Sequence, residues 1–121
     1  MTDLTLNARQ KKLLSILNAR HNVETGKELA AKLGVSERTV RNDIREINRR
    51  IVALADKLGK RVVATTDSHY TEPDDAIYRN IVMAGMGFED AESGEGLYMK
   101  TTDEMMEEFS YLGARAQEIV V

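Results

Sequence analysis

The sequence predicts a mainly α-helical (α+β) fold: a three-helix head with an elongated third helix, followed by a small α/β fragment with one or two short strands. Three observations support this prediction. Helix-capping residues alternate with apolar residues at helical spacing over residues 7–58, one short β-branched run follows, and the two halves carry opposite charge. We expect the head to occupy residues 1–51 and the fragment residues 52–121.

The first helix is predicted to begin after Asn7, which can cap it, with Gln10 three residues later completing a capping box. Its apolar stripe consists of Leu13, Leu14 and Leu17. We expect the helix to end near Arg20, before a polar break.

The second helix is predicted to start at the capping box of Thr25 and Glu28. Its inward residues are Leu29, Ala30 and Leu33. Gly34 suits the left-handed position after the helix, and Ser36 can cap the next one. Two helices joined by such a tight turn form a helix-turn-helix.

The third helix is predicted from about Glu37 to Leu58, roughly 33 Å long, because Gly59 is the first residue that suits its end. Its apolar positions are spaced four and three residues apart: Val40, Ile44, Ile47, Ile51, Leu54 and Leu58. This 40–58 seam fits a plain amphipathic helix buried within its own chain, or a helix that also pairs with a second copy in a homodimer.

The remaining elements are shorter. We expect a strand at Arg61–Thr66, a helix after Pro73, a glycine-rich acidic loop, and a second short strand in the sequence LYMK. The helix after Pro73 is expected to turn Ile77, Ile81 and Val82 inward. Thr101 and Glu104 form another capping box, Gly113 interrupts the helix that follows, and a last short helix reaches Ile119.

Composition excludes several classes of protein. The chain has no cysteine, which rules out disulfides and thiolate metal sites, and no apolar run long enough to span a membrane or serve as a signal peptide. We therefore expect a cytoplasmic protein. Residues 1–66 carry 14 Lys and Arg against 7 Asp and Glu, whereas residues 67–121 carry 3 against 13. This asymmetry indicates a polyanion partner for the first half, or two halves that attract one another.

The candidate DNA-binding residues lie around the predicted turn. In a helix-turn-helix, the start of the third helix enters the major groove of double-stranded DNA. Arginine reads guanine, asparagine reads adenine, and hydroxyls and helix N-termini hold phosphates. The candidates are Thr25, Lys27, Ser36, Glu37, Arg38, Thr39, Arg41, Asn42 and Arg45. The alternative is a solvated basic face whose arginines pair with Glu37, Asp43 and Glu46.

The run TGKELAAKLGVSERTVRNDIREIN closely resembles the helix-turn-helix of bacterial winged-helix regulators of the DeoR, PRD-antiterminator and biotin-repressor types. The resemblance covers about Leu4 to Ile51 and implies a DNA-binding head with residues 36–45 as the recognition segment. Those families follow the third helix with a glycine-rich β-hairpin wing, and no such hairpin is evident here.

Asp67 and His69 form a possible metal-binding pair just after the predicted strand. Alternation along an extended chain would place both side chains on one face, and carboxylate with imidazole suits Zn, Mn or Fe. Two ligands alone do not make a site. We therefore expect no cofactor, with a divalent metal at this pair as the alternative.

The runs LGKRVVATTDSHYTEPDDAIYRNIVMAGMGF and LYMKTTDEMMEEFSYLGARAQEIVV resemble the end of the PHP domain of PolC-type bacterial DNA polymerase III, from about Arg49 onward. That resemblance implies that Asp67 and His69 occupy two metal-ligand positions, while the family's other ligands and catalytic parts have no counterpart here. The site would be incomplete, so no enzymatic activity is expected.

Together the two resemblances describe a chimera-like chain, joined within one helix around residues 47–53. The leading hypothesis is a non-enzymatic, sequence-specific DNA-binding protein whose C-terminal half is a scaffold. The alternatives are a polymerase-derived fragment with residual metal binding, or an engineered chimera with no biological activity.

Overall fold

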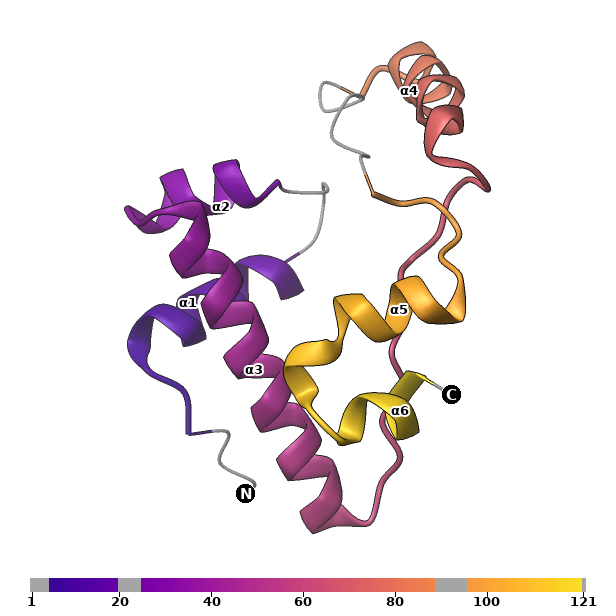
Figure 1. Ribbon diagram of the computed structural model, residues 1–121. Coiled ribbons are helices and arrows are strands. Elements are labelled where there is room, and N and C mark those ends of the chain that lie inside the picture. Colours follow the sequence, from indigo (N-terminus) through magenta and orange to yellow (C-terminus); the bar gives the residue numbers. More distant parts are fainter. Residues whose placement is uncertain (1–4, 20–24, 89–95, 121) are drawn as a thin grey trace. The chain divides into compact units, whose positions relative to one another are not determined.

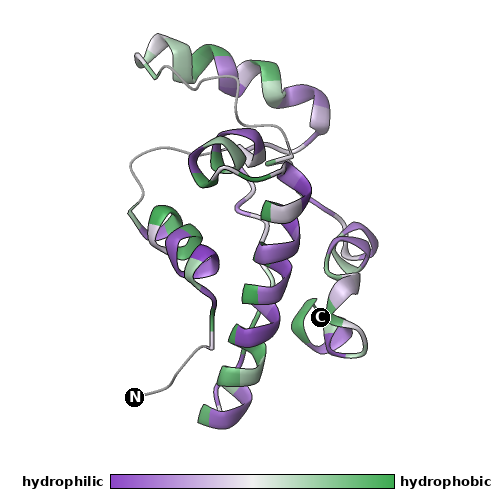
Figure 2. Cartoon of the chain, turned by 90° about the vertical axis from the view of Figure 1, so that its left-hand side faces the viewer, coloured by the Kyte–Doolittle hydropathy of each residue, from purple (hydrophilic) through white to green (hydrophobic). Residues whose placement is uncertain are grey.

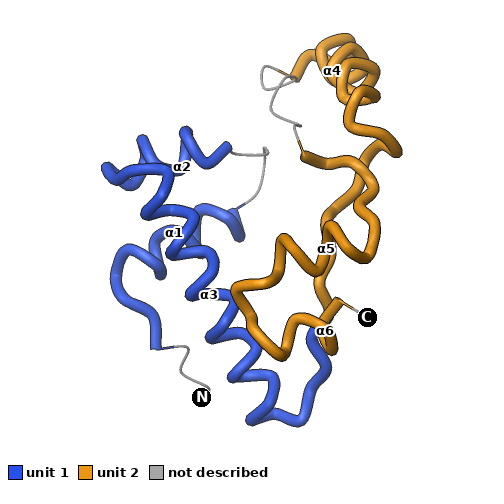
Figure 3. The backbone as a smooth tube through the Cα atoms, viewed as in Figure 1, with its two compact units in different colours: residues 1–62 blue, residues 63–121 orange. Residues whose placement is uncertain are grey.

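The computed structural model describes residues 5–19, 25–88 and 96–120 (Figure 1). The chain divides into two compact units, Met1–Val62 and Val63–Val121 (Figure 3). Each unit is considered by itself below. The mainly helical fold predicted from the sequence is confirmed, with six α-helices among the described residues.

The first two helices begin at the predicted capping boxes. In α1 (Ala8–Asn18), the Asn7 side chain accepts from the Gln10 backbone N–H at 2.9 Å, and the Gln10 side chain accepts from the Asn7 N–H at 3.1 Å. In α2 (Gly26–Leu33), Thr25 and Glu28 make the same reciprocal pair. The polar break predicted between these helices lies at residues 20–24, outside the described part of the chain.

The long third helix is confirmed at its predicted bounds. α3 runs over Glu37–Leu58, capped by Ser36 at its start and by left-handed Gly59 at its end, with φ of 61°. The Lys60 N–H returns to the Ala55 carbonyl at 2.9 Å, closing the last turn. Hydrophobic and hydrophilic residues alternate along this helix at helical spacing (Figure 2).

A small core holds the three helices of the first unit together. Its buried members are Leu13, Leu29, Ala30, Val40 and Ile47. Leu6, Ile16, Leu17, Leu33, Val35 and Ile44 are partly buried against it. The predicted inward faces of all three helices therefore meet in one cluster, which fixes the angle at which α3 leaves the turn.

This core uses the first half of the 40–58 seam. Val40 and Ile47 are buried in it and Ile44 packs against it, so these residues are not available to a second copy. Ile51 and Leu58 are 38% and 51% exposed. The part of the seam that faces solvent is thus short and broken.

The second unit contains a 3₁₀ turn and three α-helices among its described residues. These are η1 (Pro73–Asp75), α4 (Ala76–Gly85), α5 (Thr102–Glu108) and α6 (Arg115–Val120), with a second 3₁₀ turn, η2 (Ser110–Leu112), between the last two. The predicted box at Thr101 and Glu104 caps α5, and Gly113, with φ of 62°, separates η2 from α6. Nowhere in the described parts is a helix long and apolar enough to cross a membrane.

The prediction of a strand at Arg61–Thr66 is wrong. This segment is irregular, and the only pairing within the described residues is an isolated parallel bridge between Tyr70 and Tyr98. The Met99 N–H donates to the Tyr70 carbonyl at 2.9 Å, so LYMK forms part of that bridge but not of a strand. A β-branched run becomes a strand only where a partner offers a ladder of hydrogen bonds, and here none does.

The predicted orientation of α4 is also wrong. Ile77, Ile81 and Val82, expected to face inward, are 59%, 63% and 60% exposed. The apolar stripe is present at the predicted spacing, but it faces solvent. The spacing of residues along a helix does not specify which face its own chain covers.

Candidate nucleic-acid interface

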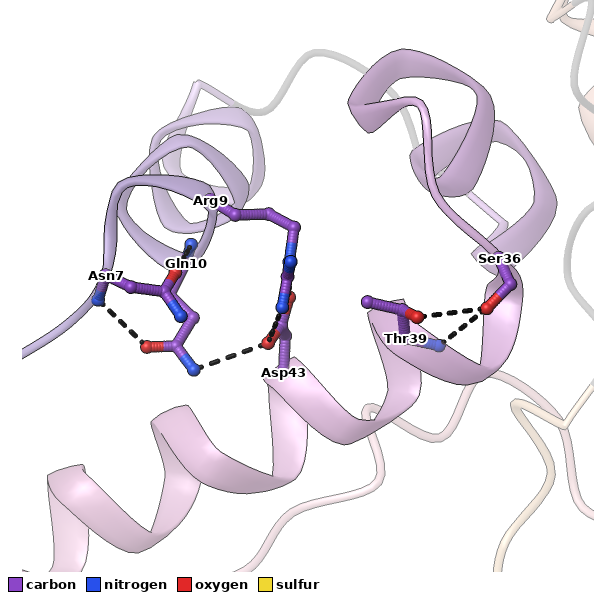
Figure 4. Close-up of polar contacts among 6 residues, drawn as sticks. All are labelled: Asn7, Arg9, Gln10, Ser36, Thr39 and Asp43. Carbon is purple, nitrogen blue, oxygen red and sulfur yellow. Dashed lines mark hydrogen bonds and ion pairs between the residues drawn. The ribbon is translucent and has the colours of Figure 1, made fainter.

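The turn between α2 and α3 is fixed by backbone and cap hydrogen bonds. Gly34 adopts the left-handed conformation at φ of 67°, and the Val35 N–H donates to the Ala30 carbonyl at 3.0 Å. Ser36 then caps α3, its hydroxyl accepting from the Thr39 N–H at 3.2 Å and lying 3.0 Å from the Thr39 hydroxyl (Figure 4). The first turn of α3 is therefore held in place before any ligand binds.

The side of α3 opposite the core carries the predicted base-reading residues. Val40, Asp43 and Ile47 are buried, whereas Arg38, Arg41, Asn42 and Arg45 are exposed. At 100° per residue these two groups fall on opposite sides of the helix. The exposed group thus has the accessibility that contact with base edges requires, and base contact itself stays a prediction.

Three of these four residues make no hydrogen bond or ion pair with any described residue: Arg38, Arg41 and Asn42. Two of the three carboxylates named as possible partners, Asp43 and Glu46, are paired with other residues. Glu46 binds Arg49 at 3.3 Å and Arg50 at 3.0 Å, on the next turn of the helix. The solvated-face alternative with Asp43 and Glu46 as partners is therefore not what this geometry shows for Arg38 and Arg41.

The predicted phosphate-contacting residues lie at the starts of α2 and α3. Thr25 accepts from the Glu28 N–H at 3.2 Å, which leaves its hydroxyl proton free to donate. Lys27 is exposed and has no partner among the described residues. Glu37 comes close to this point, since a Cβ added to Gly26 would lie 3.9 Å from Glu37 Oε2. The two helix N-termini, both favourable to anions, are thus neighbours.

A buried polar network ties α3 to α1. The Asp43 carboxylate accepts from Arg9 Nε at 2.6 Å and Arg9 Nη2 at 3.2 Å, and Gln10 Nε2 donates to it at 3.3 Å (Figure 4). Asp43 and Gln10 are only 5% and 7% exposed. Gln10 also accepts from Asn7, so one side chain both caps α1 and holds α3.

The charges of this network stabilise one another. The hydrogen bond from Arg9 lowers the pKa of the Asp43 carboxyl below its usual value, against the opposing effect of burial. The same hydrogen bond raises the pKa of the Arg9 guanidinium. Asp43 therefore remains ionised at neutral pH, next in sequence to the exposed residues Arg41 and Asn42.

This network was not predicted from the sequence, and it engages Arg9 in an ion pair with Asp43. The position of Asp43 in the sequence does predict its burial, because it lies three residues after Val40 and four before Ile47, on the buried side of α3. A charged residue at that phase requires a partner on the helix that it faces.

The metal-binding pair does not have the predicted geometry. Asp67 has a positive φ of 51°, so the chain is not extended there and its side chain does not alternate regularly with that of His69. His69 Nδ1 instead hydrogen-bonds the backbone carbonyl of Asp67. Among the described residues no group of three or more His, Cys, Asp or Glu could hold a metal ion. Metal binding at this pair stays a prediction.

The chain is similar to a group of bacterial polymerases. It is 48% identical over 80 residues to the PolC-type DNA polymerase III of Clostridium perfringens, 44% over 82 residues to that of Latilactobacillus sakei, and 43% over 82 residues to that of Bacillus subtilis. These matches cover 64–65% of this chain but only 6% of each polymerase. No solved structure matches the chain significantly.

The position of the polymerase match can be bounded by its length. A continuous match to about 65% of a chain of 121 residues must include residues 45–75 wherever it begins. It therefore contains the second half of α3 together with Asp67 and His69. The boundary between residues 51 and 52 stays a prediction about the origin of the two halves, since the compact units divide between Val62 and Val63.

The sequence pattern of a helix-turn-helix domain family, HTH_11, matches residues 9–70, which contain nearly all of α1 and the whole of α2, the turn and α3. This range is just over half of the chain, and it agrees with the three-helix core and the capped turn. The chain accordingly belongs to the HTH_11 family of HTH domains.

Proposed function

We propose that this chain is a sequence-specific double-stranded DNA-binding protein of the transcription-regulator kind, in which the first half of α3 enters the major groove. One observation carries the proposal. Arg38, Arg41 and Asn42 are exposed, without partners among the described residues, on a helix whose opposite face is locked into the core. A side chain kept free of internal partners can exchange water for base edges at little cost.

The roles of the residues follow from their chemistry and position. Arg38 and Arg41 can each donate two hydrogen bonds to guanine, and Asn42 can bind adenine in the same two-point manner. The residues at the helix starts, Thr25, Lys27, Ser36 and Thr39, would hold phosphates and set the register. Glu37 can accept from cytosine.

Arg45 lies one turn farther along α3 and is exposed. Because Arg45 already interacts within the chain, it is less suited than Arg38 and Arg41 to two-point contact with a base. We therefore assign it a phosphate contact at the edge of the groove.

We assign the second unit a scaffolding role without catalysis. The polymerases that the chain matches are about sixteen times longer than the matched segment, so their activity does not transfer with it. Asp67 and His69 offer two ligands, whereas catalytic zinc sites use three protein ligands.

The test begins with selection of a preferred duplex from a random pool by the full chain. The affinity for that duplex and for random DNA is then measured for the wild type and for Arg41→Ala and Asn42→Ala. Each loss of a two-point base contact should weaken specific binding roughly 5- to 150-fold and binding to random DNA much less. The matched control is Lys57→Ala, an exposed basic residue of the same helix about 24 Å farther along its axis, which should leave both affinities unchanged.

Two outcomes would count against the proposal. If the selection enriches no sequence, DNA binding by this chain is not sequence-specific. Failure to bind any duplex, in a chain that still melts cooperatively, would favour the alternative of an inactive chimera.

A further inference from the structure

The second unit turns an apolar helix face toward solvent. Five large apolar side chains lie along one side of α4 and just beyond its end. They are Ile77, Tyr78, Ile81, Val82 and Met86, with exposed fractions of 59%, 67%, 63%, 60% and 67%. At 100° per residue they fall within one half of the helix surface, which we call the α4 stripe. Hydrophobic residues recur along this helix, the uppermost one in Figure 2.

The polarity of α4 is the reverse of that of an ordinary surface helix. Arg79 and Asn80, on the side away from the α4 stripe, are half-buried, while the stripe is exposed. None of the residues of α4 is buried. A helix of ten residues is marginal in water without a covered apolar face, so this pattern indicates that something else covers the stripe.

The residues directly after α4 do not provide an apolar cover. Residues 89–95, which lie outside the described part of the chain, read EDAESGE and contain four carboxylates and a single alanine. Such a sequence is too polar to bury five large apolar side chains. A partner with an apolar surface of its own would fit the stripe better.

We propose that the α4 stripe is a docking surface for a second copy of this chain. The stripe contains no charged residue, so two copies can bring their stripes together without burying an unpaired charge. A two-fold axis near residue 81 would make the two helices antiparallel. The acidic starts of the helices, Asp74 and Asp75, would then lie roughly 18–21 Å from their copies along the helix axis.

The area available is adequate for a dimer. Side chains exposed to this degree present on the order of 100 Å² each, so the stripe offers about 500 Å² per copy, and a pair that covered both stripes completely would bury at most about 1,000 Å². This value meets the lower limit of about 1,000 Å² for a specific interface, which corresponds to a weak or moderate dimer. Gly85 lies in the middle of the stripe with no atom within 4 Å of an added Cβ, which leaves room for the partner's side chains.

This inference is independent of DNA binding and replaces the 40–58 seam as the expected dimer contact. Val40 and Ile47 are buried in the core of the first unit, whereas all five residues of the α4 stripe are exposed. The α4 stripe is exposed along its whole length, including Ile81 near its centre.

Sedimentation equilibrium of the full chain tests the proposal without DNA, over about 1–500 µM. The wild type should dimerise, and Ile81→Glu should raise the dissociation constant at least about 100-fold. Gln117→Glu adds the same charge at an exposed position of α6 and should leave association unchanged. Because residue 81 faces its own copy across the axis, a mixture of Ile81→Glu and Ile81→Lys should associate again. A variant that merely failed to fold would not be rescued in this way.

Each of the following results would contradict the proposed dimer. A wild type that stays monomeric at the highest concentration would overturn the proposal, as would an Ile81→Glu variant that dimerises like the wild type. A monomer whose α4 binds a purified PolC-type DNA polymerase III would assign the stripe to that partner instead. Loss of association in Gln117→Glu as well would indicate a general effect of negative charge and would also refute it.

Discussion

Replacing Asp43 with alanine should destabilise the first unit by about 1–3 kcal/mol, chiefly because the Gln10 amide, 7% exposed, would lose its acceptor in a buried site. The lost ion pair adds less than its short distance suggests, because the Arg9 side chain is 42% exposed and its charge is screened by water. Asp43→Asn keeps one oxygen for Gln10 and should cost less. Arg9→Ala keeps the Gln10 contact and should also cost less than Asp43→Ala.

The effect of acid follows from the lowered pKa of Asp43. Because its pKa in the folded unit lies below its ordinary value of 3.8, the unfolded chain binds the proton first as the pH falls. The stabilisation is therefore fully present above about pH 3.8 and is lost as the pH falls through the lower folded value. Asp43→Asn should remove this component of the acid sensitivity.

The assay must report on the first unit alone. Urea unfolding followed by the NMR signals of Leu13 and Val40, both fully buried there, meets this requirement. Free energies of unfolding for Asp43→Ala and Asp43→Asn that both lie within about 0.5 kcal/mol of the wild type would refute the reasoning. So would an Arg9→Ala variant that costs more than Asp43→Ala.

Three further results are expected. Leu13→Ala, at a fully buried position, should lower the free energy of unfolding of the first unit by about 2–5 kcal/mol in the same experiment, and a loss below about 1 kcal/mol would contradict the assigned core. Gly34→Ala, just after the end of α2, should cost about 1–2 kcal/mol because its φ is 67°. Gly26→Ala, at the start of the same helix, should be nearly neutral, since its added Cβ would lie 3.9 Å from Glu37 Oε2; equal effects would be inconsistent with the left-handed cap. Zn²⁺ should produce no saturable shift of the His69 NMR signals at micromolar concentration, since Asp67 is its one candidate co-ligand among the described residues; saturation would show a completed site.

The features that the sequence predicted correctly are those determined by neighbouring residues. The capping boxes of Asn7, Thr25 and Thr101 each join residues three positions apart, and Gly34 and Gly59 end helices through their own backbone freedom. The bounds of α3 follow from two such local signals with an uninterrupted apolar phase between them. Local chemistry was sufficient for these elements because their hydrogen bonds close within one turn of helix.

The features that it missed depend on residues distant in the sequence. Arg61–Thr66 has the composition of a strand, but the described residues contain no strand with which it could pair, and no local pattern in the sequence could predict this. Gln10 and Asp43 lie 33 residues apart, so their contact becomes visible only once α1 and α3 are packed together. The α4 stripe was recognised at its correct spacing, but the side of α4 that its own chain leaves bare is a property of the whole unit.

Because some basic residues are held in ion pairs within the chain, the salt dependence of DNA binding can be predicted. Residues 1–66 contain 14 Lys and Arg, yet Arg9 is held by Asp43, and Arg49 and Arg50 by Glu46. The cations that we propose to contact phosphates are Lys27 and Arg45. Each phosphate neutralised contributes about −0.9 to the slope of log affinity against log salt, so these two give about −2 per head on a short duplex.

A slope near −10 would mean that the whole basic half contacts DNA, and a slope near zero would exclude phosphate contacts altogether. If the exposed face of α3 carries the binding, Lys27→Ala should flatten the slope by about 0.9, whereas Lys57→Ala should not. Lys57 bears the same charge as Lys27 but lies near the end of α3, beyond the reach of a groove that receives Arg38 and Arg41. This comparison therefore separates binding at one defined face from the general attraction of a basic surface for a polyanion.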